Sequence, residues 1–446
     1  MKQHPIVVIG GGYAGLLAAR QLAAAQIPFT LYEASKNIAG LASTFKDVEG
    51  YSYDFGTHLI TNRLAQTLGI DARCRDVEYF GESVVLGSKV YSYPFGLLAV
   101  PKFSFSALKQ RLIGSPAAAA MDAAAWAEAT LGPELAREVA IPLMEKLTGV
   151  AATGLSPAIS NKLPNVLQTV MLRIAGRLSR KAVAIGYCQD LPEKASVWHA
   201  YPTGGIAMIC EHLLNGVDGN VRLESPVQKI HVENDAVVGV DVNGQTQPAA
   251  AVVSTAPVNV LPRLISGTDR LEYLKEFRYS NMIFVNLFLN GRSLMPNVAV
   301  WFPEKQYDFF RVQEPPISLP WTAPEGQTYF TADIGCHVGD QLWNAGDDAL
   351  AANCLDQLQS LVPDIKSRYS GARVLRTKIA YPVYLRAYEE ERKSFSRDSG
   401  IKGLYSVGRN GEFAHILMED VYLRTTQRVG RMIEDVNRFS GRHHPH

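Results

Sequence analysis

The sequence predicts an α/β fold whose parallel sheet is assembled from segments that lie far apart in the chain. Residues 7–33 change from an apolar strand to a glycine turn, a helix and a second strand. A third strand of the buried type is predicted at Val252–Ser254, and residues 403–439 return to a strand, a glycine loop and a long amphipathic helix. Short apolar runs bounded by turn signals are typical of strands that are buried on both faces of a parallel sheet. The residues between these segments are therefore expected to form inserted units.

The N-terminal unit carries three glycines at G-x-G-x-x-G spacing, directly after the strand Val7–Ile9. Gly10 permits a tight turn, Gly12 lets the backbone approach a pyrophosphate, and Gly15 lets the next helix pack close to the strand. Helix formers follow from Leu16 to Ala25, so the unpaired N–H groups of that helix are expected to face phosphate oxygens. The sequence therefore predicts a dinucleotide-binding loop. The residues expected to contact the dinucleotide are Gly10, Gly12, Tyr13, Ala14 and Gly15.

An acidic residue closes the second strand, Phe29–Tyr32. A carboxylate at Glu33 suits a ribose 2′-hydroxyl and repels a 2′-phosphate, so NADP is disfavoured at this site. The neighbouring Ala34 belongs to the same expected contact.

Length and composition limit the classes of protein to which the chain can belong. At 446 residues, two or three domains are expected. The chain is 47% hydrophobic and 20% charged with a net charge of +1, which gives no sign of nucleic-acid or polyanion binding. Five scattered cysteines without a CxxC pair predict reduced structural thiols, and no metal site is expected. Because the first strand begins at Ile6 and no apolar run is long enough for a membrane helix, we expect a cytoplasmic protein without a signal peptide or stable membrane anchor.

The nucleotide-type segments divide the chain into expected domains. A discontinuous, Rossmann-type dinucleotide-binding domain is predicted to combine residues 1–62, 201–257 and 397–440. Residues 63–200 are predicted to form a helical insertion, and residues 258–396 the sheet-containing part of a mixed α+β substrate domain.

Local patterns predict several elements inside these units. The alanine-rich run Ser115–Gly132 predicts one helix or two, and Ala349–Leu361 predicts another. Asn234-Asp235 and Asn243-Gly244 are hairpin signals between alternating strands. The segments "MIFVNLFLNG" and "KIAYPVYLRAY" are strand-like.

Two further stretches indicate the cofactor. "NIAGLASTF" (Asn37–Phe45) follows the acidic residue closely, and "YSYDFGTHLIT" (Tyr51–Thr61) comes soon after it. Together with the glycine loop they resemble the N-terminal pattern of the flavin amine oxidases, protoporphyrinogen oxidases and UDP-galactopyranose mutases, in which an Ile-Gly-Gly loop and an aromatic-Gly-x-His turn lie beside the flavin. Ala39 stands where that family usually has the first loop glycine, so the loop is expected to be slightly stiffer. The resemblance implies FAD as cofactor, with contacts from Gly40, Leu41, Ala42, Gly56, Thr57 and His58.

The resemblance continues to the C-terminus. "YPTGGIAMICEHL" is similar to the Pro-x-Gly-Gly helix start of the family, and "LYSVGRNGEFAHILMEDV" to its terminal flavin motif. In the family, backbone N–H groups of this motif meet the O2/N1 edge of the flavin, where a helix N-terminus stabilises negative charge on the reduced ring. The motif implies further cofactor contacts at Val227 (the adenine side), Gly408 and Arg409 (the pyrophosphate and ribityl side), and Met418, Glu419 and Val421.

The family divides over the chemistry of the flavin. Oxidases and dehydrogenases take a hydride from a carbon above N5, whereas the sugar mutases use reduced N5 as a nucleophile without net redox change. Phe413 and Ile416 occupy positions where mutases carry other residues, a tyrosine in the case of Phe413, and Thr61 stands where they have a second histidine. No arginine follows "KLP" before Arg173. We therefore predict an FAD-dependent oxidoreductase acting on a C–N, C–O or C–C bond of a small molecule; a sugar-nucleotide mutase is the alternative, and a non-catalytic flavin-binding protein the second.

Aromatic residues dominate the expected substrate face. In amine oxidases such residues form a cage that orients a neutral amine, and Tyr384 and Phe413 are the candidates here. His58 is predicted to tune the flavin or carry a proton, with stabilisation of its turn as the alternative, and Glu412 is expected either in solvent or facing the substrate. The sequence specifies no oligomeric state. The candidates for the substrate face are His58, Tyr381, Tyr384, Arg386, Tyr388, Phe413 and His415.

Overall fold

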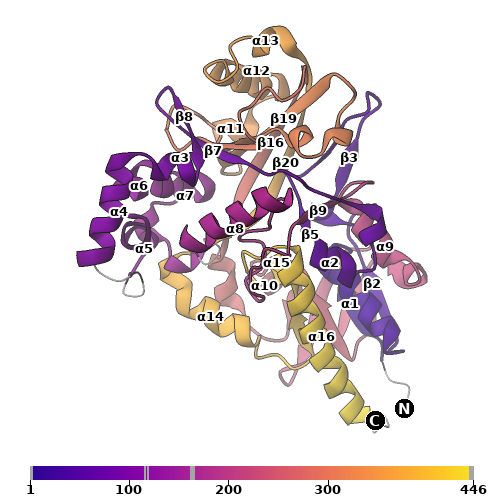
Figure 1. Ribbon diagram of the computed structural model, residues 1–446. Coiled ribbons are helices and arrows are strands. Elements are labelled where there is room, and N and C mark those ends of the chain that lie inside the picture. The colour runs from indigo at the N-terminus through magenta and orange to yellow at the C-terminus, as the bar shows by residue number, and fades with distance from the viewer. Residues whose placement is uncertain (1–3, 115–116, 118–119, 161–165, 441–446) are drawn as a thin grey trace.

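The computed structural model describes residues 4–114, 117, 120–160 and 166–440 (Figure 1). At its centre is a five-stranded sheet in the order β10–β2–β1–β14–β21, in which every neighbouring pair is parallel. Its strands come from the start, the middle and the end of the chain, which confirms the predicted α/β fold with a Rossmann-like domain. The strands are β1 (Ile6–Ile9), β2 (Phe29–Tyr32), β10 (Val221–Arg222), β14 (Ala251–Ser254) and β21 (Leu404–Ser406).

Helices cover one face of this sheet. α1 (Tyr13–Ala24) contacts both α9 (Ala207–Leu214) and α16 (Met418–Ser440). Figure 1 shows the C-terminal α16, in yellow, beside the N-terminal α1, in indigo. Leu16 and Met432 are fully buried between the helices and β1. The two ends of the chain are therefore held together by one apolar core.

A second sheet covers the opposite face. Alternate side chains of β1 point to opposite faces of the sheet, so Ile6 packs with α1 whereas Val7 packs with Val240 and other residues of this second sheet. Both predicted hairpins are present, and Asn234 and Asp235 have φ values of 49° and 58°, as a type I′ turn requires. The four strands, in sheet order, are β13 (Gln245–Pro248), β12 (Ala236–Val242), β11 (Val227–Glu233) and β15 (Ile265–Ser266).

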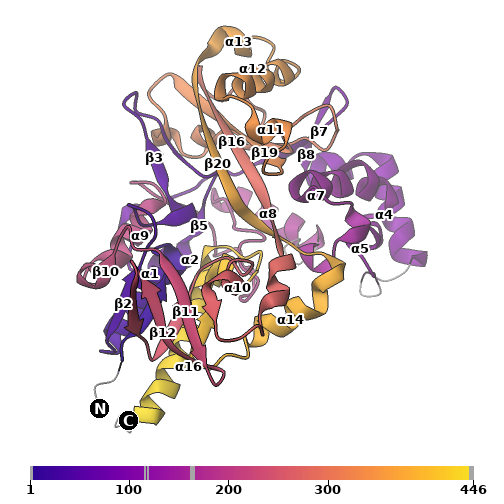
Figure 2. The same cartoon turned by 180° about the vertical axis from the view of Figure 1, so that it is seen from behind.

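A seven-stranded sheet forms the upper part of the molecule (Figures 1 and 2). The long β16 is its centre and pairs with both β19 and β20, and α12 (Asp347–Leu358) packs against the sheet. β7 and β8 come from residues 63–200, where a helical unit is predicted, so this sheet also takes strands from the insertion. The order is β20 (Tyr369–Val383), β16 (Arg278–Asn290), β19 (Gln327–Cys336), β18 (Arg311–Gln313), β17 (Ala299–Trp301), β7 (Glu82–Leu86) and β8 (Lys89–Tyr93).

The helical insertion lies to one side of this sheet (Figure 1). Within the predicted alanine-rich helix the structure shows α5 only over Ala123–Leu131, where the side chain of Asp122 caps the N-terminus by accepting from the N–H of Ala125 at 2.8 Å. Residues 115, 116, 118 and 119 of that prediction lie outside the described residues. The other helices here are α3 (Phe95–Leu98), α4 (Pro101–Ile113), α6 (Pro133–Leu135), α7 (Ile141–Thr148) and α8 (Val166–Ser179).

Small elements connect the two large sheets. The strands are β3 (Thr44–Lys46) with β4 (Ser52–Asp54), and β5 (Ile60–Thr61), β9 (His199–Pro202) and β6 (Cys74–Asp76). The remaining helices are α2 (Asn62–Thr67), α10 (Leu261–Leu264), α11 (Gln341–Asn344), α13 (Ile365–Arg368), α14 (Glu389–Arg397) and α15 (Gly408–Gly411). Within the described ranges, no helix has both the length and the apolar character to cross a bilayer. The five cysteines are free thiols.

Candidate active site

The glycine loop has the geometry that its spacing predicts. Gly10 has φ +99°, and a Cβ on Gly15 would lie 1.9 Å from the carbonyl oxygen of Gly10. A Cβ on Gly12, by contrast, would meet nothing nearer than the Ala39 oxygen at 3.8 Å. Gly12 also precedes α1 without a side-chain cap, so the first N–H groups of the helix are available to an anion. The loop therefore fits a pyrophosphate.

Glu33 lies against this loop. Its Oε2 accepts from the N–H of Gly11 at 2.6 Å, and its Oε1 accepts from the N–H and hydroxyl of Ser35 at 2.8 and 2.7 Å. Oε2 retains a further lone pair for a ribose hydroxyl. The N–H of Ser225 donates to the Glu33 carbonyl at 2.8 Å, which brings the buried Val227 near this end of the loop. This arrangement agrees with an adenosine position beside Glu33, and Ala34 is exposed there.

The loop that contains Ala39 also contacts the glycine loop. The N–H of Ala39 donates to the carbonyl of Gly11 at 2.9 Å, and Gly40–Ala42 form a single 3-10 turn, which places Leu41 next to these residues. Ala39 has φ +84°, a conformation that L side chains rarely adopt. The alanine therefore introduces backbone strain at a position where a glycine would have none.

Replacing Ala39 with glycine is expected to raise the free energy of unfolding by about 1 kcal/mol, because the left-handed conformation costs a residue with a Cβ about 1–2 kcal/mol and glycine loses part of that gain in backbone entropy. Urea unfolding followed by tryptophan fluorescence measures the difference. Gly69 has φ +68°, and a Cβ added there would meet no atom within 4 Å, so Gly69→Ala is the matched control and is expected to destabilise the protein. A lower free energy of unfolding in the Ala39→Gly variant would show that the backbone at Ala39 is not strained.

The C-terminal motif reaches the same loop. A Cβ on Gly408 would lie 2.6 Å from the Cβ of Ala14, so Gly408 packs on the first turn of α1. Arg409 donates from Nε to the carbonyl of Ile416 at 3.0 Å. Met418 begins α16, so the N-terminus of this helix lies inside the C-terminal motif, as the resemblance implies.

Two residues that are expected to contact the cofactor use their side chains for contacts within the protein. The Glu419 carboxylate is held by Arg63 through two hydrogen bonds of 2.6 and 3.0 Å. Val421 is buried in the core around α1. At both positions, contact with a cofactor is therefore left to the backbone.

The aromatic-Gly-x-His turn lies between the two large sheets. A Cβ on Gly56 would lie 3.1 Å from the ring of Phe284 and 3.9 Å from Nη2 of Arg311. The N–H of Thr57 donates to Oε1 of Gln313 at 3.2 Å. Among the described residues, the buried Thr57 hydroxyl and the Nδ1 atom of His58 have no hydrogen-bond partner. Buried polar atoms are seldom left unpaired, so this turn fits a bound polar group such as the edge of a flavin.

His58 is neutral at physiological pH. Burial lowers its pKa to about 4, and the positive charges of Arg409 and Arg311 act in the same direction. An imidazole with this pKa is uncharged at pH 7 and cannot act as an imidazolium acid. Of the predicted roles, hydrogen bonding to a ligand or within the turn therefore agrees with the structure better than proton donation.

The ion pair of Arg311 and Asp333, which lies near the turn at Gly56, was not predicted from the sequence. Arg311 on β18 donates from Nε and Nη2 to Oδ2 of Asp333 at 2.7 and 2.5 Å, and the Asp333 side chain is fully buried. Burial lowers the pKa of Arg311, but the Asp333 charge more than offsets this effect and raises it overall. The available signal was an aspartate inside the apolar strand "TYFTADIGC", because buried charges are almost always paired.

Two tyrosines complete the face. The Tyr381 ring lies 4.7 Å from the ring of His415, and the Arg409 guanidinium carbon is 5.4 Å from the centre of the Tyr381 ring. Tyr187 was not among the residues predicted at the substrate face. Burial raises its pKa, and it lies close enough to Arg311 for that positive charge to act in the opposite direction. The substrate-face cluster, as we call it, consists of His58, Tyr187, Arg311, Tyr381 and Arg409.

The predicted aromatic cage is not formed. Phe413 has 0% exposure and is enclosed by Phe277, Tyr279 and Tyr388, with ring centres 4.7–6.0 Å away. Tyr384 is 5% exposed, and its hydroxyl accepts from the N–H of His415 at 2.7 Å. A ring without exposed surface cannot contact a substrate, so Phe413 is a core residue and the cage prediction is wrong. Tyr384 positions the His415 loop.

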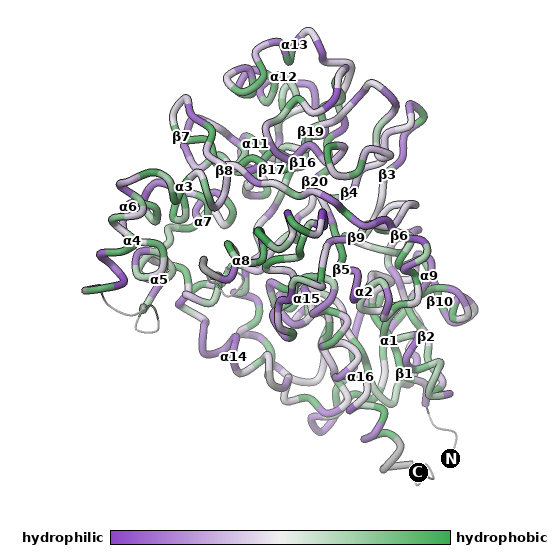
Figure 3. Tube along the Cα trace, viewed as in Figure 1, coloured by the Kyte–Doolittle hydropathy of each residue, from purple (hydrophilic) through white to green (hydrophobic). Residues whose placement is uncertain are grey.

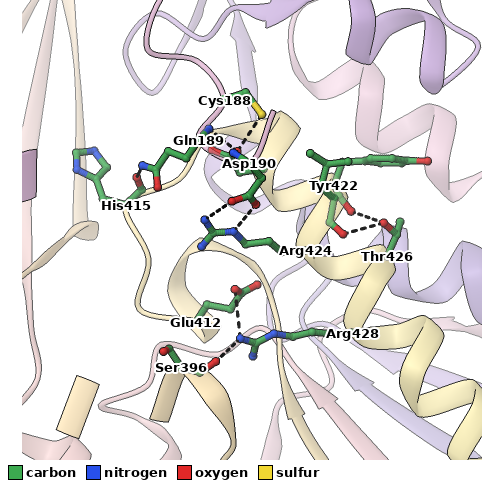
Figure 4. A network of polar contacts seen from close by, with 12 residues as sticks. Cys188, Gln189, Asp190, Ser396, Glu412, His415, Tyr422, Arg424, Thr426 and Arg428 are labelled. Carbon is green, nitrogen blue, oxygen red and sulfur yellow. Dashed lines mark hydrogen bonds and ion pairs between the residues drawn. The ribbon is translucent and has the colours of Figure 1, made fainter. Parts of the chain in front are cut away.

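Three other residues that were considered for the substrate face also make their contacts within the protein. Tyr388 is buried and donates its hydroxyl to the Val383 carbonyl. Arg386 is exposed and donates to the carbonyl of Thr153 at 3.2 Å. Glu412 is buried rather than in solvent. Its Oε2 lies 3.5 Å from Nη2 of Arg428, the side chain that faces it in Figure 4, and its Oε1 accepts from the N–H of Gly408 at 3.2 Å. Glu412 therefore stabilises the C-terminal motif from behind.

The buried Asp54, next to this turn, is expected to make the free energy of unfolding depend on pH. Its buried carboxylate accepts from the hydroxyls of Thr44 and Tyr201 at 2.7 and 2.8 Å, and burial raises its pKa from 3.8 to about 7. The folded state therefore holds a proton that the unfolded state releases above about pH 4, so this contribution to stability is complete below pH 4 and is lost as the pH rises through 7.

We subtract the free energy of unfolding of the natural protein from that of the Asp54→Asn variant. This difference is expected to rise between about pH 5 and pH 8, by a few kcal/mol at most, because only the natural protein loses the contribution of Asp54. Free energies of unfolding of both proteins in urea at the two pH values give this difference and cancel the other titrating groups. Equal differences at both pH values would show that Asp54 has an ordinary pKa.

The comparisons with known proteins agree with this geometry. Residues 13–429 match the family of flavin-containing amine oxidoreductases. The chain is 23% identical to a chloroplastic/chromoplastic 15-cis-phytoene desaturase of Glycine max, covering 92% of this chain and 75% of the relative. A reduced UDP-galactopyranose mutase has a similar fold, with a TM-score of 0.78 and 17% identity over 97% of this chain and 96% of the mutase. The cyclohexylamine oxidase of Brevibacterium oxydans has a TM-score of 0.73 and 15% identity, over 98% of this chain and 100% of the oxidase. Because the family match extends over most of the chain, from the start of α1 to the C-terminal motif and α16, the protein belongs to the flavin-containing amine oxidoreductases.

Proposed function

We propose that the protein is an FAD-dependent oxidoreductase that removes a hydride from a C–N, C–O or C–C bond of an uncharged small molecule. Membership of the family implies a flavin. The dinucleotide form, FAD, is supported by the glycine loop and by Glu33, because a flavin mononucleotide lacks the adenosine ribose that this carboxylate would bind.

Distinct residues would hold the two ends of the cofactor. The N-terminus of α1 and Gly12 suit the pyrophosphate, and Thr57 and His58 supply unpaired polar atoms near the other end. When bound, the flavin supplies the hydride acceptor. The protein's own residues then orient the substrate: the Tyr381 ring offers an apolar surface, and the neutral His58 adds no charge beside it.

The main support for an uncharged substrate is the charge balance of the substrate-face cluster. Arg311 is neutralised by Asp333, and the nearby Arg173 is neutralised by Glu82 at 2.6 Å. His58 is uncharged at pH 7. Arg409 is thus the one cation of the cluster without a carboxylate partner among the described residues. A face with so little net charge suits a neutral substrate.

One observation favours a mutase as the second candidate. Arg409 is available to one phosphate, and the overall fold resembles that of the galactopyranose mutase. The diphosphate of a sugar nucleotide, however, carries two negative charges, and the paired Arg173 and Arg311 have no charge left to bind the second. The redox reaction therefore agrees better with the site.

Anaerobic absorbance spectroscopy distinguishes the candidates. The oxidised protein is mixed with a panel of amines, alcohols, polyenes and sugar nucleotides, and bleaching of the flavin band by one of the neutral compounds is the expected result. Turnover of a sugar nucleotide only after reduction by dithionite, with the flavin remaining reduced, would instead show a mutase. A colourless protein that does not bind added FAD would overturn the cofactor assignment.

A further inference from the structure

Two helices of the insertion expose apolar side chains at the same helical spacing. On α4, Phe105, Leu108 and Leu112 are 72, 54 and 73% exposed. On α8, Met171, Ile174 and Leu178 are 62, 44 and 83% exposed. Both sets follow the positions i, i+3 and i+7, which lie on one side of a helix. Each helix therefore carries a continuous apolar stripe that faces away from the protein core.

The opposite sides of both helices are anchored in the protein. On α4, Phe103 is 2% exposed. On α8, Leu172 is buried, and Arg173 donates to the Phe80 carbonyl and to Glu82 at 2.5 and 2.6 Å. The helices are thus held firmly, and the exposure of their outer stripes does not result from loose packing.

The charges between the apolar residues all have one sign. Neither α4 nor α8 contains an aspartate or glutamate. Within the described part of the chain, no carboxylate lies within ion-pair distance of the exposed Lys109, Arg111, Arg177 or Arg180. Helices that lie in a bilayer interface combine apolar residues with lysine and arginine in this way.

The two helices are connected through α3. The Arg177 guanidinium carbon lies 4.8 Å from the centre of the Phe95 ring, and Phe95 begins α3, which leads into α4. Leu98 on α3 is itself 36% exposed. Figure 1 shows α3, α4 and α8 in the same part of the molecule, and Figure 3 shows that α8 is largely hydrophobic.

We propose that α4 and α8 dock the protein peripherally on the surface of a bilayer that contains anionic phospholipids. The apolar stripes would enter the boundary between headgroups and acyl chains, and the unpaired cations would lie at the lipid phosphates. This docking needs no membrane-spanning helix. It is independent of the proposed reaction, because it uses no residue of the substrate-face cluster.

Flotation with vesicles of phosphatidylcholine, with or without phosphatidylglycerol, tests the proposal on the complete flavin-loaded protein. We expect the protein to float with the anionic vesicles and binding to weaken as salt is added. The variant Leu108→Gln/Leu112→Gln/Leu178→Gln is expected to bind at least about tenfold more weakly, because three exposed apolar side chains are removed. The variant Lys109→Gln/Arg111→Gln/Arg180→Gln is expected to lose the preference for anionic vesicles.

The matched control is Val48→Gln/Val338→Gln, which removes apolar side chains that are 102 and 51% exposed outside these helices. It is expected to float like the natural protein. Because all the substituted residues are exposed, thermal unfolding should be the same for every variant, which separates loss of binding from loss of folding. Failure to float with anionic vesicles would overturn the proposal. So would a dimer, measured by light scattering, that the apolar variant dissociates, since a second copy would then cover the stripes.

Discussion

Replacing Arg311 with methionine is expected to lower the free energy of unfolding by about 3–5 kcal/mol, because it leaves a carboxylate without its partner in the protein interior. Asp333 has 0% exposure, and both hydrogen bonds from Arg311 go to one of its oxygens. Urea unfolding at neutral pH measures the loss. The stability of the variant is also expected to recover partly as the pH is lowered, because burial raises the pKa of the Asp333 carboxyl and protonation removes the unpaired charge.

The double variant Arg311→Met/Asp333→Leu tests the physical cause. If the loss comes from an unpaired charge rather than from lost packing, the double variant should be more stable than Arg311→Met alone. The exposed pair of Arg270 and Asp235 provides the control, since Arg270→Met is expected to change stability by less than about 1 kcal/mol. A double variant less stable than both single variants would show that the pair contributes mainly through its packing.

Replacing Gly15 with alanine is expected to give the largest loss of bound flavin. The added Cβ would lie 1.9 Å from the Gly10 carbonyl oxygen, so α1 must move away from the glycine loop. Overpacking of this kind costs about 1–3 kcal/mol or more, and it displaces the helix N-terminus that is expected to face the pyrophosphate. The ratio of flavin to protein absorbance after gel filtration, and the Kd for added FAD, measure the effect; we expect affinity to fall at least about tenfold.

Gly219→Ala is the control for this substitution. A Cβ at Gly219 would meet no atom within 4 Å, and its φ value is one that alanine adopts readily. This variant should retain flavin like the natural protein. Retention of flavin by Gly15→Ala would mean that the loop accommodates the helix shift, and that the cofactor is held mainly by other contacts.

Much of the fold follows from local sequence. The strand β1, the glycine loop, α1 and β2 appear where their spacing predicts them, because each depends on neighbouring residues: apolar runs, glycine conformations and helix formers. The hairpins at Asn234-Asp235 and Asn243-Gly244 follow from residues that tolerate positive φ. In the same way, Glu33 lies beside the glycine loop because β1 and β2 are paired neighbours.

The arrangement of the substrate face depended on tertiary structure. The pair Arg311 and Asp333 joins two antiparallel strands, and Arg409 approaches Tyr381 from a distant segment, so no local pattern connects them. Phe413 was expected at the substrate because it lies in the C-terminal motif, but its φ of +51° and the surrounding rings turn it into the core. The hairpin of β7 and β8 was missed, and its place in the large sheet depends on β17, the second partner of β7, which lies more than two hundred residues away.

The sequence by itself thus determined the family's cofactor loop and the α/β class, since these depend on contacts between residues that are near in the chain or on a motif. Tertiary structure alone decided which charges are paired, which aromatic rings are buried and which helix faces remain exposed. These properties depend on the three-dimensional surroundings of each side chain, and function depends on such sites rather than on the fold class alone.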